Sequence, residues 1–208
     1  MPTLTTPAMT RAILAALALC AFLPLAAPAQ QPQRPPQGPR AMPSTRATTE
    51  VQLTHRRIGS QWFQTGVAGG PIRIAIDYGQ PHLRGRQLDA VVPLDSIWRL
   101  GANLATHLVT DVDVTIGGQI VPRGTYTLFA QRTGAGWRLV ISRQTAQWGT
   151  EYDATADVGR VPLRARTLGE SVESLSIYLV PAAEQAAGDL PRGELRIAWG
   201  TVELTTEW

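Results

Sequence analysis

Hydrophobic and polar residues alternate with a period of two along most of the chain after residue 50. In the segment 71–78, Ile72, Ile74 and Ile76 fall on one side, and Arg73 and Asp77 fall on the other. Because successive side chains of a strand point to opposite faces, this pattern predicts a half-buried antiparallel strand. The same period recurs, with turn residues between, in the segments 125–131, 137–142, 158–166, 172–180, 194–199 and 201–206.

Glycine and proline mark the predicted turns. Gly117-Gly118 predicts a tight hairpin, since glycine tolerates the positive φ angles that such turns need, and Gly200 predicts another between the last two strands. The turn spacing predicts an all-β domain, an antiparallel β-sandwich of jelly-roll-like form with about ten strands. The predicted core residues are Ile72, Ile74, Ile76, Leu128, Leu139, Ile141, Leu175, Ile177, Leu179, Leu195 and Ile197.

Residues 1–29 resemble a secretory signal peptide. Arg11 gives a positive start, residues 12–26 form an apolar run, and Ala27-Pro28-Ala29 is a small-x-small cleavage site. Cleavage after Ala29 predicts a periplasmic or secreted mature chain. The alternatives are lipid attachment at Cys20 and an uncleaved anchor, but the run is shorter than the ~20 residues that a span needs. We expect no transmembrane segment in the mature chain.

The segment 30–49 is rich in Pro, Gln and Arg and almost lacks large apolar side chains. Such a composition cannot bury enough surface to offset the entropy lost on ordering, which predicts a disordered linker. The folded domain is therefore expected to span residues 50–208.

Charge and cysteine content exclude several functional classes. The 19 basic residues are all arginine and give a net charge of +3, but they are interspersed with acidic residues. No basic run typical of nucleic-acid binding is present, so we expect no nucleic-acid partner. The only cysteine, Cys20, lies in the leader, which predicts a mature domain without disulfides or thiolate metal sites.

The stretch 78–108 carries a high density of large polar and aromatic side chains among glycines and prolines. A long loop that keeps such side chains is typical of a functional site held on a rigid scaffold. The residues expected to form this site, with Trp148 as a wall, are Tyr78, His82, Arg86, Trp98, Arg99, Asn103, His107 and Trp148.

Trp98, Arg99 and Asn103 have two interpretations. In the first they bind a ligand, because an indole face beside directional polar groups suits a sugar ring or a carboxylate. In the second Trp98 plugs one end of the sandwich, and the two polar side chains satisfy loop carbonyls. The sequence leaves both open, and the partner expected from the first is a small molecule or saccharide.

The sequence contains no motif of a known catalytic mechanism. It lacks a Gly-x-Ser-x-Gly elbow and a glycine-rich phosphate loop between a strand and a helix. The histidines lack short metal-ligand spacing, although His82 and His107 flank the polar stretch and are placed to converge with Asp77. Asp111 and Asp113 share one strand face, where charges commonly keep an edge strand soluble. We therefore expect no metal and no cofactor.

Several motifs resemble those of DUF2911, a bacterial family of unknown function. They are Tyr78-x-x-Pro81, Gly85-Arg86, Val92-Pro93, Trp98-Arg99-x-Gly101-Ala102-Asn103 with Thr106, Pro122-x-Gly124-Thr125-Tyr126-x-Leu128-Phe129, Gln147-Trp148-Gly149 and Ala198-Trp199. The resemblance covers about residues 51–206. It implies a secreted or periplasmic β-rich protein and supplies no established activity.

Two functional hypotheses follow. The first is a non-catalytic exported module that binds a ligand or serves a structural role in the cell envelope. The alternative is a hydrolase-like or metal-dependent enzyme that uses His82 or His107 with a nearby carboxylate. The lack of a recognisable nucleophile, metal motif or cofactor loop favours the first.

Overall fold

Antiparallel β-strands make up almost all of the regular structure in this protein. The structure is a computed structural model, and it describes residues 44–53, 55–58, 61–64, 72–183 and 192–208. All of them belong to one compact unit, Ala41–Trp208. The predicted signal peptide and the predicted linker up to residue 43 lie outside the described residues.

The elements are β1 (Thr45–Leu53), β2 (His55–Ile58), β3 (Gln61–Gln64), β4 (Ile72–Gln80), α1 (Leu88–Val91), β5 (Ile97–Trp98), β6 (Thr106–Thr110), β7 (Val114–Ile116), β8 (Gln119–Val121), β9 (Gly124–Thr133), β10 (Gly136–Ser142), a 3₁₀ turn η1 (Ala154–Ala156), β11 (Asp157–Pro181) and β12 (Gly193–Glu207). Within the described residues, no helix is both long and apolar enough to cross a membrane.

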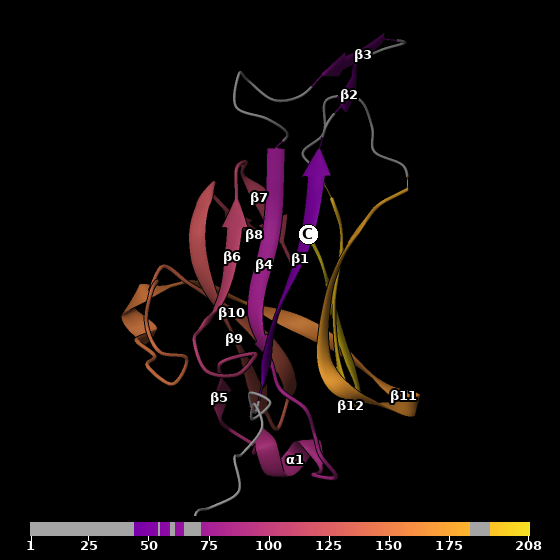
Figure 1. Ribbon diagram of the computed structural model, residues 1–208. Coiled ribbons are helices and arrows are strands. Elements are labelled where there is room, and N and C mark those ends of the chain that lie inside the picture. Colours follow the sequence, from indigo (N-terminus) through magenta and orange to yellow (C-terminus); the bar gives the residue numbers. More distant parts are fainter. Residues whose placement is uncertain (1–43, 54, 59–60, 65–71, 184–191) are drawn as a thin grey trace, which may run out of the picture. The chain divides into compact units, whose positions relative to one another are not determined.

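One eight-stranded sheet forms the framework, in the order β1-β4-β6-β9-β10-β11-β12, with β5 paired to β9. Figure 1 shows how it curls into a half-barrel. The hairpins β2–β3 and β7–β8 form separate two-stranded sheets, and the β7–β8 turn is the predicted one at Gly117-Gly118. The all-β antiparallel prediction is confirmed. The difference from a sandwich is that most strands belong to one curved sheet.

Strand β11 accounts for the continuity of this sheet. Its first part pairs with β10 and the remainder pairs with β12, so one strand joins what was expected to be two layers. The register shifts between Thr167 and Val172 and again before Ser176, and such bulges bend and twist a strand. Gly200, with a φ of 61°, lies opposite Val172. The hairpin predicted at Gly200 is therefore wrong, because this glycine forms an irregularity inside the continuous strand β12.

The last part of β11 returns to the end of β4 and to β1. Alternate backbone N–H groups on its edge facing away from β12 find acceptors there instead of a strand partner. The pairs are Leu175 N with Pro81 O (3.0 Å), Ile177 N with Tyr78 Oη (3.2 Å) and Leu179 N with Thr49 Oγ1 (3.3 Å). We call these three bonds the seam. They satisfy donors that an unpaired strand edge would otherwise offer to other chains.

Strand β1 begins at Thr45 and pairs with β4 along its whole length. The paired structure therefore begins before the domain boundary predicted at residue 50. Polar residues of the predicted linker therefore belong to a strand and bond to other strands of the domain. Thr48 Oγ1 donates to Asp77 Oδ2 at 2.9 Å, and Thr49 accepts the seam bond from Leu179.

The concave side of the sheet holds the hydrophobic core. Most of the predicted core residues are buried, and Ile72 and Leu179, which lie near strand ends, are half-buried. The core also contains side chains that were not predicted for it, including Tyr126, Trp199 and Trp208.

Candidate functional site

The segment between β4 and β6 is held tightly against the sheet. Ala102 N donates to Gly79 O at 3.1 Å, and the fully buried Thr106 hydroxyl donates to Leu100 O at 2.9 Å. A Cβ on Gly79 would lie 1.9 Å from Ala102 O, so only glycine fits there. Leu100 and Asn103 have left-handed φ angles of 49° and 63°. This packing fixes the positions of the side chains that the turn carries.

Two of the predicted site residues serve the seam region. Tyr78 is 4% exposed, its hydroxyl accepts from Ile177 N, and burial raises its pKa. His82 forms an isolated bridge with Ser174, and its Nδ1 lies 2.7 Å from Ser174 Oγ. Both side chains therefore attach β4 and the following loop to β11.

Arg86, which is exposed, and Trp98, which is half-buried, also contact other parts of the protein. Arg86 donates from Nε to Leu83 O at 2.9 Å and from Nη2 to His82 O at 2.8 Å. Trp98 stacks on buried Trp199, with ring centroids 5.3 Å apart and planes 15° apart. Trp98 therefore packs against an interior side chain, and Arg86 satisfies two loop carbonyls. We call Tyr78, His82, Arg86 and Trp98 the seam group.

The motifs at 98–103 and 147–149 meet in space. Gly149 N donates to Asn103 O at 3.1 Å, and Leu104 and Trp148 form an isolated antiparallel bridge. A Cβ on Gly149 would lie 2.5 Å from Arg99 Cδ, so the Arg99 side chain packs directly on this glycine. Contacts between two segments that are distant in the sequence thus bring the backbones of Arg99, Asn103 and Trp148 close to one another.

Arg99 and Asn103 carry the two polar side chains at this meeting point. Arg99 and Asn103 are half-buried, yet no described residue hydrogen-bonds or ion-pairs with the guanidinium or with the side-chain amide. Trp148 is 47% exposed. This region therefore presents a cation, an amide and an indole whose polar side-chain atoms bond to no other described residue.

His107 belongs to a polar row on the convex face of the sheet. Directly paired residues of neighbouring strands project from the same face. The row consists of Thr48, Asp77, His107, Thr127 and Ser142. Its members alternate with core residues such as Ile76 and Leu108, so they face away from the core.

The row connects His107 to the segment 147–149. Gln147 Nε2 donates to Thr127 Oγ1 at 3.1 Å, and Thr127 is the strand neighbour of His107. His107 Nε2 and Gln147 Oε1 are buried without a partner among the described residues. Burial, and secondly the positive charge of Arg46, lower the pKa of His107. Arg46 itself forms an ion pair with Asp77.

The segment 143–156 is anchored over the same face. Tyr152 packs edge-on against Phe129, with ring centroids 4.9 Å apart, and donates its hydroxyl to Asp157 Oδ2 at 2.6 Å. Burial, reinforced by the hydrogen bond to Asp157, raises the pKa of Tyr152 to about 12. Arg160 Nη2 lies 2.6 Å from the same hydroxyl. These contacts hold the segment that carries Gln147 and Trp148.

We call Arg99, Asn103, His107 and Trp148 the outer-face group.

In the part of the chain that the structure describes, no three His, Cys, Asp or Glu side chains come together in a group that could hold a metal ion. His107 lies beside Asp77, as the sequence anticipated, whereas His82 lies at the seam. The side chain of His55 lies outside the described residues.

Residues 61–207 match the family described as "Protein of unknown function (DUF2911)". The chain belongs to this family. No curated protein and no solved structure matches it. The DUF2911 match begins in β3 and ends in β12, so it includes both the seam group and the outer-face group.

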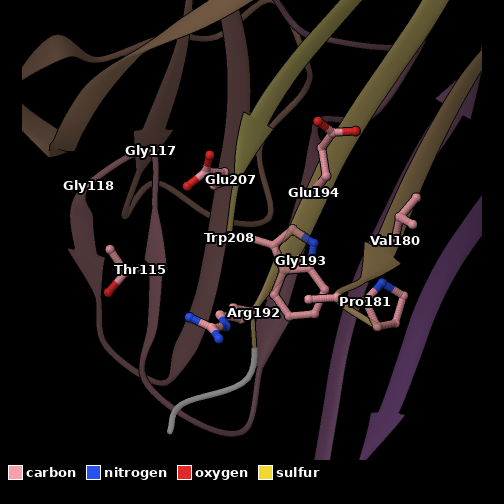
Figure 2. A pocket seen from close by; sticks show the side chains of 11 residues that line it. Thr115, Gly117, Gly118, Val180, Pro181, Arg192, Gly193, Glu194, Glu207 and Trp208 are labelled. Carbon is pink, nitrogen blue, oxygen red and sulfur yellow. The ribbon is translucent and has the colours of Figure 1, made fainter. Parts of the chain in front are cut away.

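The DUF2911 domain also contains a pocket of about 730 Å³ that the sequence did not reveal (Figure 2). It is lined by Thr115, Gly117, Gly118, Val180, Pro181, Ala182, Arg192, Gly193, Glu194, Glu207 and Trp208. None of these is a predicted site residue. Glu194 and Glu207 both lie near Arg164, at 3.7 and 3.8 Å, and Trp208 is buried. The pocket draws on four separate segments, so no local motif marks it.

Proposed function

We propose that this DUF2911 protein is a non-catalytic module that binds a small molecule at the outer-face group. The observation that carries the proposal is a contrast in partners. The seam group is bonded or stacked within the protein, whereas no described residue bonds to the polar side-chain atoms of Arg99 and Asn103. No polar side-chain atom of Arg99 or Asn103 is both buried and without a partner, so these atoms remain open to solvent. An anionic or hydroxyl group of a ligand can replace that water with direct hydrogen bonds to the guanidinium and the amide.

The surroundings of the outer-face group hold its residues in place, which favours ligand binding. Gly149 contacts the Arg99 stem, and the Asn103 backbone is fixed by the bond from Gly149 N. Polar groups that are held in place lose little conformational freedom when a ligand arrives, which favours affinity. The family likeness supplies no activity, so it neither adds nor removes a reaction.

A melting experiment tests the proposal. The purified domain would be heated with and without a panel of sugars, carboxylates and divalent metals. We expect at least one compound to raise the melting temperature, because a ligand that binds only the native state stabilises it. Asn103→Gly should lose that shift and keep the parent stability, because glycine tolerates the left-handed φ of 63° at this position. If no compound shifts the parent and Asn103→Gly is destabilised by about 1–3 kcal/mol, the side chain serves the scaffold.

We also propose that the chain acts in the periplasm or outside the cell. The support is the sequence of residues 1–29, with its apolar run and the Ala27-Pro28-Ala29 cleavage site. The expected mature chain begins at Gln30. Intact-mass measurement of the protein from the cell envelope checks this, and a lipid-modified Cys20 or an uncleaved chain would contradict it.

One contact favours a second candidate, a hydrolase. The 2.7 Å separation of Ser174 Oγ and His82 Nδ1 is the geometry of a hydroxyl activated by a base. Among the described residues, no carboxylate hydrogen-bonds to this imidazole to orient it, which weighs against the candidate. Treatment with a fluorophosphonate followed by peptide mass spectrometry decides. A stoichiometric adduct on Ser174 would support hydrolysis, and an unmodified Ser174 would exclude this serine as the nucleophile.

A further inference from the structure

Gln147 and His107 project from the same face of the sheet. The antiparallel bridge at Trp148 places Gln147 opposite Ala105, and Ala105 N donates to Gln147 O at 3.5 Å. Directly opposed residues project to one side, as do residues two apart in a strand, so the Gln147 side chain lies on the side of Ala105 and His107. Its bond to Thr127 agrees with this placement, because Thr127 is the strand neighbour of His107.

Both side chains bury a polar atom to which no described residue bonds. Gln147 is 9% exposed, and its Oε1 and His107 Nε2 are the atoms concerned. A protonated imidazole carries a hydrogen on each ring nitrogen, so protonation would bury a charged donor at Nε2. Burial is the first cause, and the charge of Arg46 the second cause, of the lowered pKa of His107. Moving Gln147 away would let water reach the ring.

The charged groups around His107 do not compensate a proton on its ring. Asp77 on β4 is its strand partner, but that carboxylate is ion-paired with Arg46 of β1. Arg99, which packs on the segment 147–149, is a second cation. The neighbours of the ring on β9 and at position 147 are uncharged. The charged side chains of the segment 143–156 are exposed, so solvent screens them, and they are Arg143, Glu151 and Asp153.

We propose that His107 makes the attachment of segment 147–149 to the sheet depend on pH, with protonation of the ring releasing Gln147 from β9. Release also loosens the bond from Gly149 N to Asn103 O, two residues along the chain. The outer-face group then loses its arrangement in acid, and in this respect the inference rests on the proposed function and adds regulation of the same site. The release itself needs no ligand.

Amide hydrogen exchange at pH 7.5 and pH 5.5, without any ligand, tests this inference. In the attached segment the pKa of His107 is below 6.5, whereas after release the ring is hydrated and its pKa returns to about 6.5. Acid therefore favours release, and the protection factor of Gly149 N–H should fall by up to about tenfold between the two pH values. Gly193 N–H, which bonds to Trp208 O, should keep its protection factor and so reports any global loss of stability.

Three variants assign the effect. His107→Asn removes the titrating ring, so the protection factor of Gly149 N–H should be the same at both pH values. Gln147→Met removes the bond to Thr127 and should lower that protection already at pH 7.5. His82→Asn is the matched control, because it alters the histidine at the seam and should leave the pH response of Gly149 intact.

Two results in the parent protein would overturn the inference, and neither depends on a variant folding. An equal protection factor of Gly149 N–H at both pH values would show that the segment does not respond to His107. A higher protection factor at pH 5.5 would show that the protonated ring donates to Gln147 Oε1 and holds the segment in place. Exchange is measured without ligand and the melting panel with ligands, so failure of this inference and failure of the proposed function are distinguishable.

Discussion

The seam group and the outer-face group come largely from one stretch of sequence, yet the fold uses them in opposite ways. Trp98 and Arg99 are adjacent in the chain. Trp98 stacks on Trp199 in the interior, while Arg99 packs on Gly149 and its guanidinium bonds to no residue that the structure describes. Residue type does not distinguish them, since each group contains an arginine, a histidine and a tryptophan. What distinguishes them is whether the rest of the chain supplies partners.

The comparison implies that the seam group stabilises the fold and that the outer-face group does not. Seam contacts join residues that are far apart in sequence, such as Tyr78 and Ile177. They close the curled sheet where strand pairing ends. Substitutions in the two groups should therefore separate clearly in unfolding experiments.

The largest expected effect is on Trp98. Trp98→Ala should lower the free energy of unfolding by about 3 kcal/mol, because it removes the stacking partner of buried Trp199 and leaves a cavity. Trp148→Ala is the matched control, and we expect a change within about 0.5 kcal/mol because that indole is exposed. Urea denaturation of both variants measures the difference. Equal losses would remove the distinction between the groups.

A smaller loss is expected at the seam hydroxyl. Tyr78→Phe keeps the ring but leaves the buried Ile177 N–H without its acceptor, which should lower stability by about 1–3 kcal/mol. Tyr178→Phe removes an exposed hydroxyl and should have almost no effect. Amide hydrogen exchange adds a local readout, since Ile177 should lose protection in Tyr78→Phe. Unchanged protection would mean that the seam bond is dispensable.

His107 predicts a pH dependence of stability. Its pKa is lowered from 6.5 in the native state, so below pH 6.5 the unfolded chain binds a proton that the native protein resists. The free energy of unfolding should therefore fall as the pH drops from 6.5 towards the native pKa. His107→Asn should remove this part of the loss, which urea midpoints at pH 7.5 and 5.5 would show. An equally steep loss in the variant would refute the assignment to His107.

The sequence predicted those features that depend on local patterns. Alternation identified the core-facing residues of strands such as β4, and Gly117-Gly118 marked a real hairpin. In β9 and β10 both faces are buried over several successive residues, which alternation did not indicate. It misplaced Gly200, because a glycine with positive φ serves a bulge as well as a turn. It also expected two sheets, because alternation reports the faces of a strand and carries no information on which strands are neighbours.

The candidate site could be predicted only as a set of residues. Whether His82 is bonded depends on Ser174, and whether Tyr78 is bonded depends on Ile177, and neither partner is marked by any local motif. The same holds for the pocket around Trp208, whose walls come from four segments. Two motifs that looked independent, at 98–103 and 147–149, proved to be in contact through Gly149. Which side chain finds a hydrogen-bond partner is decided by how distant segments pack in the folded chain.

The most direct measurement of the central claim compares two arginines in the absence of any ligand. Arg86 donates to two loop carbonyls, whereas Arg99 has no partner among the described residues. We predict that Arg86→Gln lowers the free energy of unfolding by about 1 kcal/mol, and that Arg99→Gln changes it by less than about 0.5 kcal/mol or raises it. If Arg99→Gln costs as much as Arg86→Gln or more, the outer-face group belongs to the scaffold.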